Sequence, residues 1–335
     1  MNQSRTLPPA LTGDHSHLSA QARQEIRALS GAQPKAFLMQ ALGAWIVIIA
    51  TIALAIYIDN IWMTLLAILI IGTRFNIFGL LVHEQAHSLG IRGKYGDSIT
   101  NILAAYPLGI TVEDYANVHL SHHKFFLTQD DPDFSRKAGI DWAFPMPTRR
   151  LIKLFIKDLM GFSFIQLVKS KRLEKKSSYR RLYPSPKWLR SVFYLIIAAL
   201  LTYSNTWDLF LIYWILPLVT ILPAVIRIGA LCEHIYNAAP HTSIINSTPI
   251  IFLSWWEKLI IPDLNFKLHT YHHFYPGIAF CNLPKVHEIF QREQLVNEEA
   301  VFYGFCSFFR FLQSSQSPIK RAMTYHPEGE KLRTE

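Results

Sequence analysis

Four long apolar runs dominate the sequence, and they fall into two pairs. The runs are residues 36–58, 61–82, 188–203 and 209–231. Only Asp59 and Asn60 separate the first pair, and the last run contains Pro217 and Pro223. An α-helix needs about 20 mainly apolar residues to cross a bilayer. We therefore expect an all-α integral membrane protein with about four transmembrane helices in two hairpins, the last helix kinked if its prolines fall inside it.

Composition and charge agree with a membrane protein. The chain is 50% hydrophobic and 17% charged, whereas an ordinary globular protein has roughly 25% charged residues. Its three cysteines show no paired spacing, which argues against a disulfide framework or a cysteine-ligated zinc. The net charge is +9, but the basic residues are segregated, which disfavours nucleic-acid binding.

The basic residues also predict an orientation. Neither turn between paired runs carries Lys or Arg, whereas residues 83–190 hold eighteen. By the positive-inside rule, both termini and this large loop face the cytosol, and we expect a bacterial inner membrane. Segment 149–168 alternates basic and apolar residues, as an interfacial helix does. The basic run 169–181 is a solvated face, a contact for anionic lipids or a docking site for an acidic redox partner.

Histidines gather in three clusters and at one further position near the ends of these runs. The clusters read HEQAH (83–87), HLSHH (119–123) and HTYHH (269–273), and His234 follows the last run. Positions i, i+3 and i+4 of a helix project from one face. Two metals sharing the nine rings would each receive four or five nitrogen ligands, of a type that suits iron, zinc, copper or nickel. The candidate ligands are His83, His87, His119, His122, His123, His234, His269, His272 and His273.

Two other functions can be weighed against this pattern. HEQAH alone matches the HExxH motif of zinc metalloproteases, with Glu84 as the catalytic base, but that interpretation leaves the other clusters unexplained. A metal transporter would spread its ligands through the middle of the spans, whereas these lie at one end. Four histidines outside these clusters lack partner spacing, so we expect them at the surface: His15, His17, His287 and His326.

At these motifs the sequence resembles the integral-membrane fatty acid desaturase and hydroxylase superfamily, which has three histidine boxes and a non-haem di-iron centre. The resemblance covers about residues 36–290. The matching segments are HEQAH, VHLSHHKFFLTQDDPD (118–133), RIGALCEH (227–234) and NFKLHTYHHFYPGIAFCNLPKVH (265–287). It implies that the nine histidines hold two iron ions in a cytosolic helical cap. It also implies a cytosolic arm at 1–35, a desaturase-like catalytic domain at 36–290 and a cytosolic tail at 291–335.

The resemblance extends to residues around the ligands. Related acyl-CoA desaturases carry an asparagine that contacts iron through water, and Ala230 stands at that position here. Among Asp130, Asp131 and Asp133, the resemblance favours Asp133 as a support for the second box. The candidates for supporting the ligands are Glu84, Asp133, Glu233 and Asn265.

The activity that the resemblance implies is O₂-dependent desaturation of the acyl chain of a lipid or an acyl thioester. Hydroxylation or ketolation of a fatty chain, carotenoid or alkane stays open, because one ligand set supports both outcomes. Electrons would come from a separate donor, such as ferredoxin or a cytochrome or flavoprotein reductase chain. An acyl chain would lie in an apolar tunnel between the spans. The aromatic residues there either line it or simply pack the helices: Trp45, Phe75, Phe78, Tyr194 and Trp214.

Overall fold

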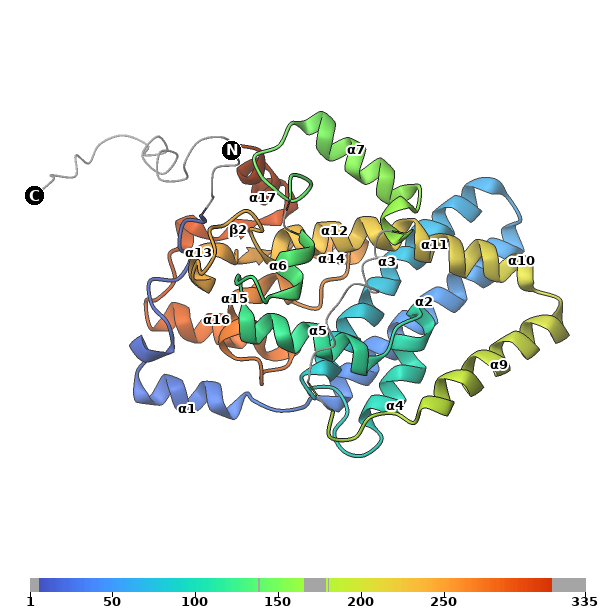
Figure 1. Cartoon of the computed structure of the whole chain (residues 1–335), viewed down its shortest axis with the longest axis horizontal. Helices are drawn as coiled ribbons and strands as arrows, with labels where there is room; N and C mark the ends of the chain where they lie inside the picture. The colour runs from blue at the N-terminus through green and yellow to red at the C-terminus, as the bar shows by residue number, and fades with distance from the viewer. Residues whose placement is uncertain (1–5, 138, 166–178, 180, 315–335) are drawn as a thin grey trace, which may run out of the picture.

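The computed structural model describes residues 6–137, 139–165, 179 and 181–314, and this part of the chain is mostly helical (Figure 1). Its long helices are α2 (Pro34–Ile58), α3 (Ile61–Ala86), α9 (Lys187–Ser204) and a composite helix over Trp207–Glu233. The shorter helices are α1 (Ala20–Ala28), α4 (Gly96–Thr100), α5 (Val112–Phe125), α6 (Pro132–Lys137), α7 (Thr148–Leu159), α13 (Ile244–Ser247), α14 (Trp255–Ile260), α15 (His269–Phe274), α16 (Leu283–Arg292) and α17 (Gly304–Gln313). Strands β1 (Ile251–Phe252) and β2 (Phe302–Tyr303) pair in parallel.

Two expectations concern residues outside the described part of the chain. These residues are His326 and most of the basic run 169–181.

Helices α2 and α3 form the hairpin that the sequence predicts. Asp59 ends α2 in the left-handed conformation, with φ 47°, and the Asn60 side chain accepts a hydrogen bond from the Met63 amide at 2.9 Å. Both helices are long and apolar enough to cross a membrane. Their outer faces expose large apolar side chains, including Ile46 at 66% and Trp62 at 78%. An apolar belt of this kind would favour aggregation in water, so the hairpin is consistent with a membrane protein.

The composite helix is the third that is long and apolar enough to cross a membrane. It consists of α10 (Trp207–Phe210), a π-helix (Leu211–Ile215), α11 (Leu216–Val219) and α12 (Ile221–Glu233). The α-helical pattern stops at Thr220, whose φ is −113°. Pro217 and Pro223 flank that point, and each lacks the N–H that an unbroken helix would use. The predicted irregularity of this run is therefore present.

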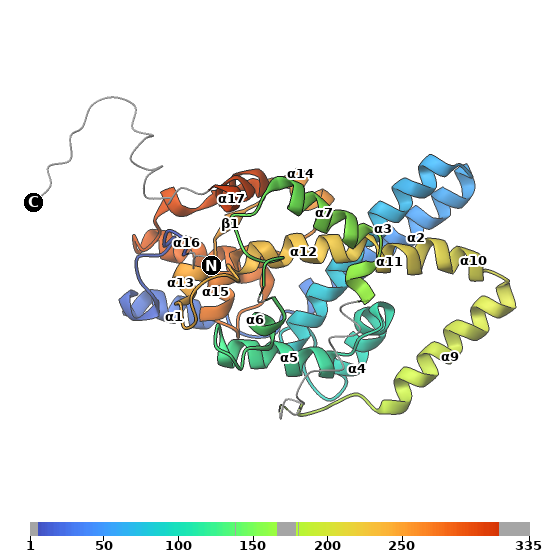
Figure 2. The same ribbon diagram turned by 45° about the horizontal axis from the view of Figure 1, so that its top comes forward.

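Within the described chain, three helices meet the length and hydropathy requirements for crossing a membrane, one fewer than predicted. Helix α9 falls short because Lys187 and Arg190 lower the hydropathy of its 18 residues. None of its residues is buried, and Figures 1 and 2 show it standing apart from α2 and α3. It is tied to the core by the Tyr194 hydroxyl, which donates to the Tyr106 carbonyl at 2.9 Å. A fourth crossing remains a prediction.

Aromatic side chains fill the interior between the spans. The Trp45 ring lies 5.2 Å from Phe78 and 5.4 Å from Trp214, and Phe75 lies 4.8 Å from Trp214, measured between ring centroids. Phe75 and Phe78 are completely buried. Of the five aromatic residues expected to line a tunnel or to pack the helices, four thus pack against one another, and the Tyr194 hydroxyl donates to a backbone carbonyl.

Side chains of the spans also donate hydrogen bonds to backbone carbonyls of an irregular segment. The indole N–H groups of Trp45 and Trp214 donate to the carbonyls of Leu103 and Pro107, at 2.9 and 3.0 Å. These carbonyls belong to the segment 101–108, which forms a π-helix (Asn101–Ala105) and a 3₁₀-helix (Tyr106–Leu108). A carbonyl without a partner is costly in a lipid environment. The indoles therefore allow a segment too short to cross the membrane to pack against α3.

Helix α14 is anchored to α3 in the same way. Arg74 donates to the carbonyl of Leu259, and the Asn76 amide donates to that of Pro262 at 2.7 Å. The Leu259 carbonyl belongs to the last turn of α14, where a helix leaves its carbonyls without intrahelical partners, and the Pro262 carbonyl follows just after the helix. The two polar residues inside the second apolar run thus hold the cap against the span.

The cap surrounds the ends of α3 and α12 where the histidines lie. The N-terminal arm is part of it, because Leu11 and Ile26 pack with Tyr271 and Phe290 in one buried cluster. Residues beyond 290 contribute too, since β2 pairs with β1 and the Phe308 ring of α17 is buried. The cap therefore contains described parts of both the arm and the tail, and domain boundaries at 35 and 290 remain a prediction. The cap also contains the 3₁₀-helices His15–His17, Phe266–Leu268, Phe280–Asn282 and Glu298–Ala300.

A buried ion pair joins α7 to α12. The Arg227 guanidinium donates from Nε to Asp158 Oδ2 at 2.5 Å and from Nη2 to Oδ1 at 2.9 Å. Its guanidinium carbon lies 4.8 Å from the centre of the Trp142 ring, and the Ser163 hydroxyl also donates to the carboxylate. This two-point contact fixes α7, whose exposed face carries Ile152 and other apolar residues.

We expect Asp158→Ala to destabilise the fold by about 3–5 kcal/mol, because it leaves the Arg227 charge buried without its partner. The matched control is Asp141→Ala, which breaks the partly exposed pair with Arg150 and should cost less than about 1 kcal/mol. Thermal unfolding of the two variants in the same detergent measures the difference. Equal thermal unfolding midpoints for the two variants would show that the buried Asp158–Arg227 pair does not hold α7 in place.

Candidate metal centre

Nine histidines converge at the junction of the spans and the cap, in two groups. The ligand atoms within each group all lie within 4.8 Å of one another. The first group is His83, His87, His119, His123 and His272, and the second is His122, His234, His269 and His273. The structure therefore brings together every histidine that the sequence proposes as a ligand.

The spacing inside each box explains how the groups divide. On α5, the i,i+4 pair His119 and His123 serves the first group, while His122 turns to the second. On α15 the roles are exchanged, because the i,i+4 pair His269 and His273 serves the second group and His272 the first. Residues i and i+4 lie close together on one helix face, and the ring at i+3 reaches the other group. Each HxxHH box thus contributes to both groups.

The remaining ligand candidates lie at helix ends. His83 and His87 stand on the last turn and the C-cap of α3, and His234 follows α12 in an extended conformation. The His83 ring lies 4.1 Å from the His119 ring and 4.5 Å from the His272 ring. HEQAH therefore faces the other two boxes and contributes two candidate ligands to a larger site.

The geometry of the nitrogen atoms fits metal ions. In the first group, Nε2 of His119 lies 2.8 Å from that of His87 and 3.0 Å from that of His123. In the second, Nε2 of His234 lies 3.1 Å from those of both His269 and His273. Two nitrogens bound to one metal at about 2.1 Å are separated by about 3 Å. The rings thus point the same nitrogen inward at the spacing that ligands of a common ion require.

Buried nitrogens without partners give independent support. Among the described residues, neither ring nitrogen of His83 has a hydrogen-bond partner, and neither does Nδ1 of His269 or His272. A buried polar atom left unpaired costs about 1–3 kcal/mol. Metal coordination through Nε2 would remove part of this cost, so the residues present fit metal ions well.

The protonation state of the rings is also suitable. Burial lowers the pKa of His87 to about 4 and that of His123 to about 2, and it lowers the pKa of His269 and His272 well below the usual range. The Arg181 charge lowers the pKa of His87 further, and neighbouring imidazoles lower the pKa of the other three. These imidazoles are therefore neutral near pH 7, the form that binds metal.

Two outer hydrogen bonds orient the second group. The Nδ1–H of His122 donates to both carboxylate oxygens of Asp131, at 2.9 and 3.0 Å, and Asp131 is fully buried. The Nδ1–H of His234 donates to the hydroxyl of Thr248 at 3.0 Å. Such partners fix the tautomer that turns Nε2 toward the metal. Asp131 also accepts from the amides of Leu127 and Asp133, so it organises the turn after α5.

The four expected supporting residues lie in other contacts. The carboxylate of Asp133 pairs with Lys137 at 3.2 Å, so Asp131 occupies the place expected for Asp133. The Glu84 carboxylate is buried and accepts from the Phe280 amide at 3.2 Å. Two further candidates remain: Glu233 ends α12 half-buried, and Asn265 donates to the Phe280 carbonyl at 3.2 Å. The buried Ala230 offers no polar side chain to the second group.

Sequence reasoning was wrong about one histidine outside the boxes. His287 is buried, and the Tyr271 hydroxyl lies 2.7 Å from its Nδ1. His287 thus contacts Tyr271 of α15. His15 and His17 are exposed, as expected. The spacing of His287 from His269 could not reveal its contact with Tyr271, which depends on how α16 packs against α15.

Two further residues, Gln85 and Arg181, support the end of the first box, and the sequence spacing did not indicate them. The Gln85 amide binds the Asp97 carboxylate at 2.9 Å. Arg181 donates to both oxygens of Asp97 and to the last carbonyls of α3, those of Gln85 and Ala86. A basic residue at a helix C-terminus satisfies carbonyls in this way, and here it steadies the end of the first box.

Comparisons with known proteins agree with this site. A sequence model described as fatty acid desaturase matches residues 60–304, a range that contains all nine histidines. The chain is also similar to the dihydrorhizobitoxine desaturase of Bradyrhizobium elkanii. The two are 25% identical over 268 residues, which are 77% of this chain and 76% of the relative.

Replacing one ligand in each group should reveal two unequal metal sites. We expect His269→Ala to lower the metal content more than His87→Ala, because it leaves three imidazoles in its group instead of four. The control is the exposed His15→Ala. Metal analysis of the purified proteins after dialysis against a weak chelator measures the effect. Equal metal content in all three variants would contradict the two-group assignment.

The partner of His122 can be tested separately. We expect Asp131→Asn to lower metal affinity at the second group about 10- to 100-fold, because a ligand's outer hydrogen bond fixes its orientation. Asp133→Asn should have a smaller effect, since that carboxylate pairs with Lys137. Competitive chelator titration compares the two variants. A larger loss from Asp133→Asn would restore the expectation from sequence.

Proposed function

Because the chain belongs to the fatty acid desaturase family, we propose that it is an O₂-dependent membrane desaturase that introduces a double bond into an acyl chain. The observation that carries the proposal is the pair of all-imidazole groups at the ends of α3 and α12. The name of the bacterial relative supports desaturation as the outcome. The substrate we propose is the acyl chain of a lipid or an acyl thioester.

Iron is the metal that we propose for both groups. Imidazole ligands suit iron but also zinc and copper, so family membership supports the choice. When bound, a pair of irons supplies reductive activation of O₂ and removal of two hydrogens from neighbouring methylenes. Electrons would come from a separate ferredoxin or a cytochrome or flavoprotein reductase chain. We further propose that the site faces the cytosol of a bacterial inner membrane, where such donors are found.

The protein's own residues would position these components. Each HxxHH box directs side chains to both groups, so α5 and α15 fix the separation between the two centres. The bond from Asp131 holds the His122 ring in one tautomer. Glu84 joins the end of α3 to the loop after α15 through the Phe280 amide. These contacts would keep the ligand set rigid while a substrate enters.

Product analysis would test the proposal. The chain is expressed in a bacterial host under air, and its acyl lipids and acyl thioesters are compared with those of a His272→Ala strain. We expect an alkene product in the wild type, lost in His272→Ala and lost without O₂, whereas His15→Ala retains it. A product that has gained an oxygen atom would instead indicate hydroxylation. A purified protein that binds zinc and yields no oxidised product would contradict the proposal.

A further inference from the structure

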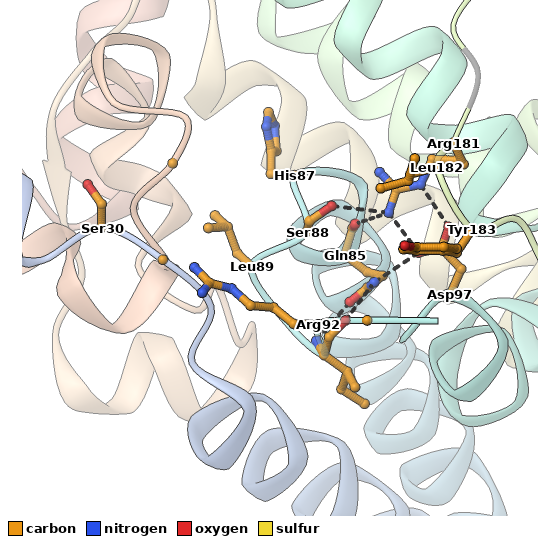
Figure 3. Close-up of a pocket in the computed structure, with 14 residues that line it drawn as sticks. Ser30, Gln85, His87, Ser88, Leu89, Arg92, Asp97, Arg181, Leu182 and Tyr183 are labelled. Atoms are coloured by element: carbon orange, nitrogen blue, oxygen red, sulfur yellow. Dashed lines mark hydrogen bonds and ion pairs between the residues drawn. The ribbon is translucent and has the colours of Figure 1, made fainter. Parts of the chain in front are cut away.

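A cavity of about 600 Å³ lies beside the first histidine group (Figure 3). His87 forms part of its wall, together with the loop that follows HEQAH. This volume is within the range of small-molecule binding sites. The cavity therefore meets the candidate metal centre at a ligand-bearing edge. The other lining residues come from three segments: Ser30 and Gly31 of the arm, Gly277, and Arg181 to Tyr183.

One cation of this cavity is already neutralised. The Arg181 guanidinium binds both oxygens of Asp97, at 2.7 and 2.8 Å, and the two side chains are largely buried. Its remaining donors reach the carbonyls at the end of α3. Figure 3 shows this network as dashed lines on the side of the cavity that carries Asp97 and Gln85. Arg181 is therefore a structural residue with little capacity left for a ligand.

Arg92 differs from Arg181. Its guanidinium forms no hydrogen bond or ion pair with any residue that the structure describes, and Figure 3 shows its side chain extending toward Ser30. The guanidinium passes over Gly31, where a Cβ would come within 2.6 Å of Nη2. A glycine at this point lets the charged group lie against the cavity wall. Arg92 is exposed at the mouth of the cavity. With the Asp97 charge neutralised by Arg181, Arg92 gives the cavity one cation that no described acidic side chain pairs with.

The packing between the spans indicates which end of a substrate enters here. Phe75 and Phe78 lie about one to two turns before His83 on α3. They pack with Trp45 and Trp214 and so fill the interior between the spans. The cavity beside His87 carries charged and polar groups next to apolar side chains such as Leu89 and Leu182. It can therefore hold a polar end together with the first carbons of the attached chain. A guanidinium binds carboxylate and phosphate groups through paired hydrogen bonds.

We propose that Arg92 binds the anionic headgroup of the substrate, a carboxylate or a phosphate, and so places the attached chain beside the His87 edge of the metal centre. This assignment rests on the proposed oxidation of an acyl substrate, and it adds the chemical class of the group that the site recognises. Arg92 is thus a specificity-determining residue, and Arg181 holds the cavity wall on which it depends.

Binding of small amphiphiles would test this without requiring turnover. The metal-loaded protein in nanodiscs of neutral phosphatidylcholine is titrated with octanoate, octyl phosphate and octanol. We expect the wild type to bind one or both anions at least about tenfold more tightly than the alcohol. Arg92→Gln should remove this preference and Arg92→Lys should keep part of it. Lys94→Gln, which removes an exposed charge outside the cavity, should leave it unchanged. Comparing octanoate with octyl phosphate identifies the headgroup.

Two results would overturn the assignment. One is equal affinity of the wild type for the anions and the alcohol, and the other is an unchanged preference in Arg92→Gln. If turnover is found, a chemical reductant provides a further test. A defect of Arg92→Gln that appears with a protein donor and vanishes with dithionite would assign Arg92 to donor docking, against the proposal. A preference for anions without any oxidised product would retain the binding site and refute the proposed reaction.

Discussion

The packing of nine imidazole rings against one another, seven of them buried and two half-buried, is the condition on which the rest of the structure depends. Nitrogen faces nitrogen at about 3 Å across both groups, and the described surroundings leave both nitrogens of His83 without a partner. Each unpaired buried polar atom costs about 1–3 kcal/mol. A bound metal ion would coordinate one nitrogen of each ring in its group, and its binding free energy would then add to the stability of the cap.

The surrounding contacts follow from the same need to satisfy polar groups where water is scarce. Irregular backbone in segment 101–108 is capped by indole N–H groups of the spans, and the end of α14 by Arg74 and Asn76. Asp158 and Arg227 neutralise each other between α7 and α12. In a low-dielectric setting such contacts are specific, because leaving either partner alone is costly. They attach the cap to the helices at fixed points and so keep both histidine groups at the ends of α3 and α12.

Local periodicity predicted much of this arrangement, and long-range contacts account for most of what it missed. The turn at Asp59 and the convergence of the boxes follow from apolar runs and from i,i+3,i+4 spacing, which a single segment contains. The support of His122 depends on which carboxylate of a turn points inward, and the structure places Asp131 there instead of Asp133. His287 was expected at the surface because its contact with Tyr271 requires α16 to pack against α15. Helix α9 falls short of the hydropathy of a membrane span because Lys187 and Arg190 lie within its 18 residues, so the fourth crossing stays a prediction.

The filled interior between the spans limits how a substrate can reach the metals. A chain that entered between Trp45 and Trp214 would separate two rings that stack at 5.4 Å and also donate to the carbonyls of segment 101–108. Separating such an aromatic pair costs about 0.5–1.5 kcal/mol beyond the lost burial, and the two hydrogen bonds add to that cost. The cavity beside His87 is already open and carries the uncompensated charge of Arg92. Entry of a polar end through this cavity therefore requires less rearrangement than entry of a tail between the helices.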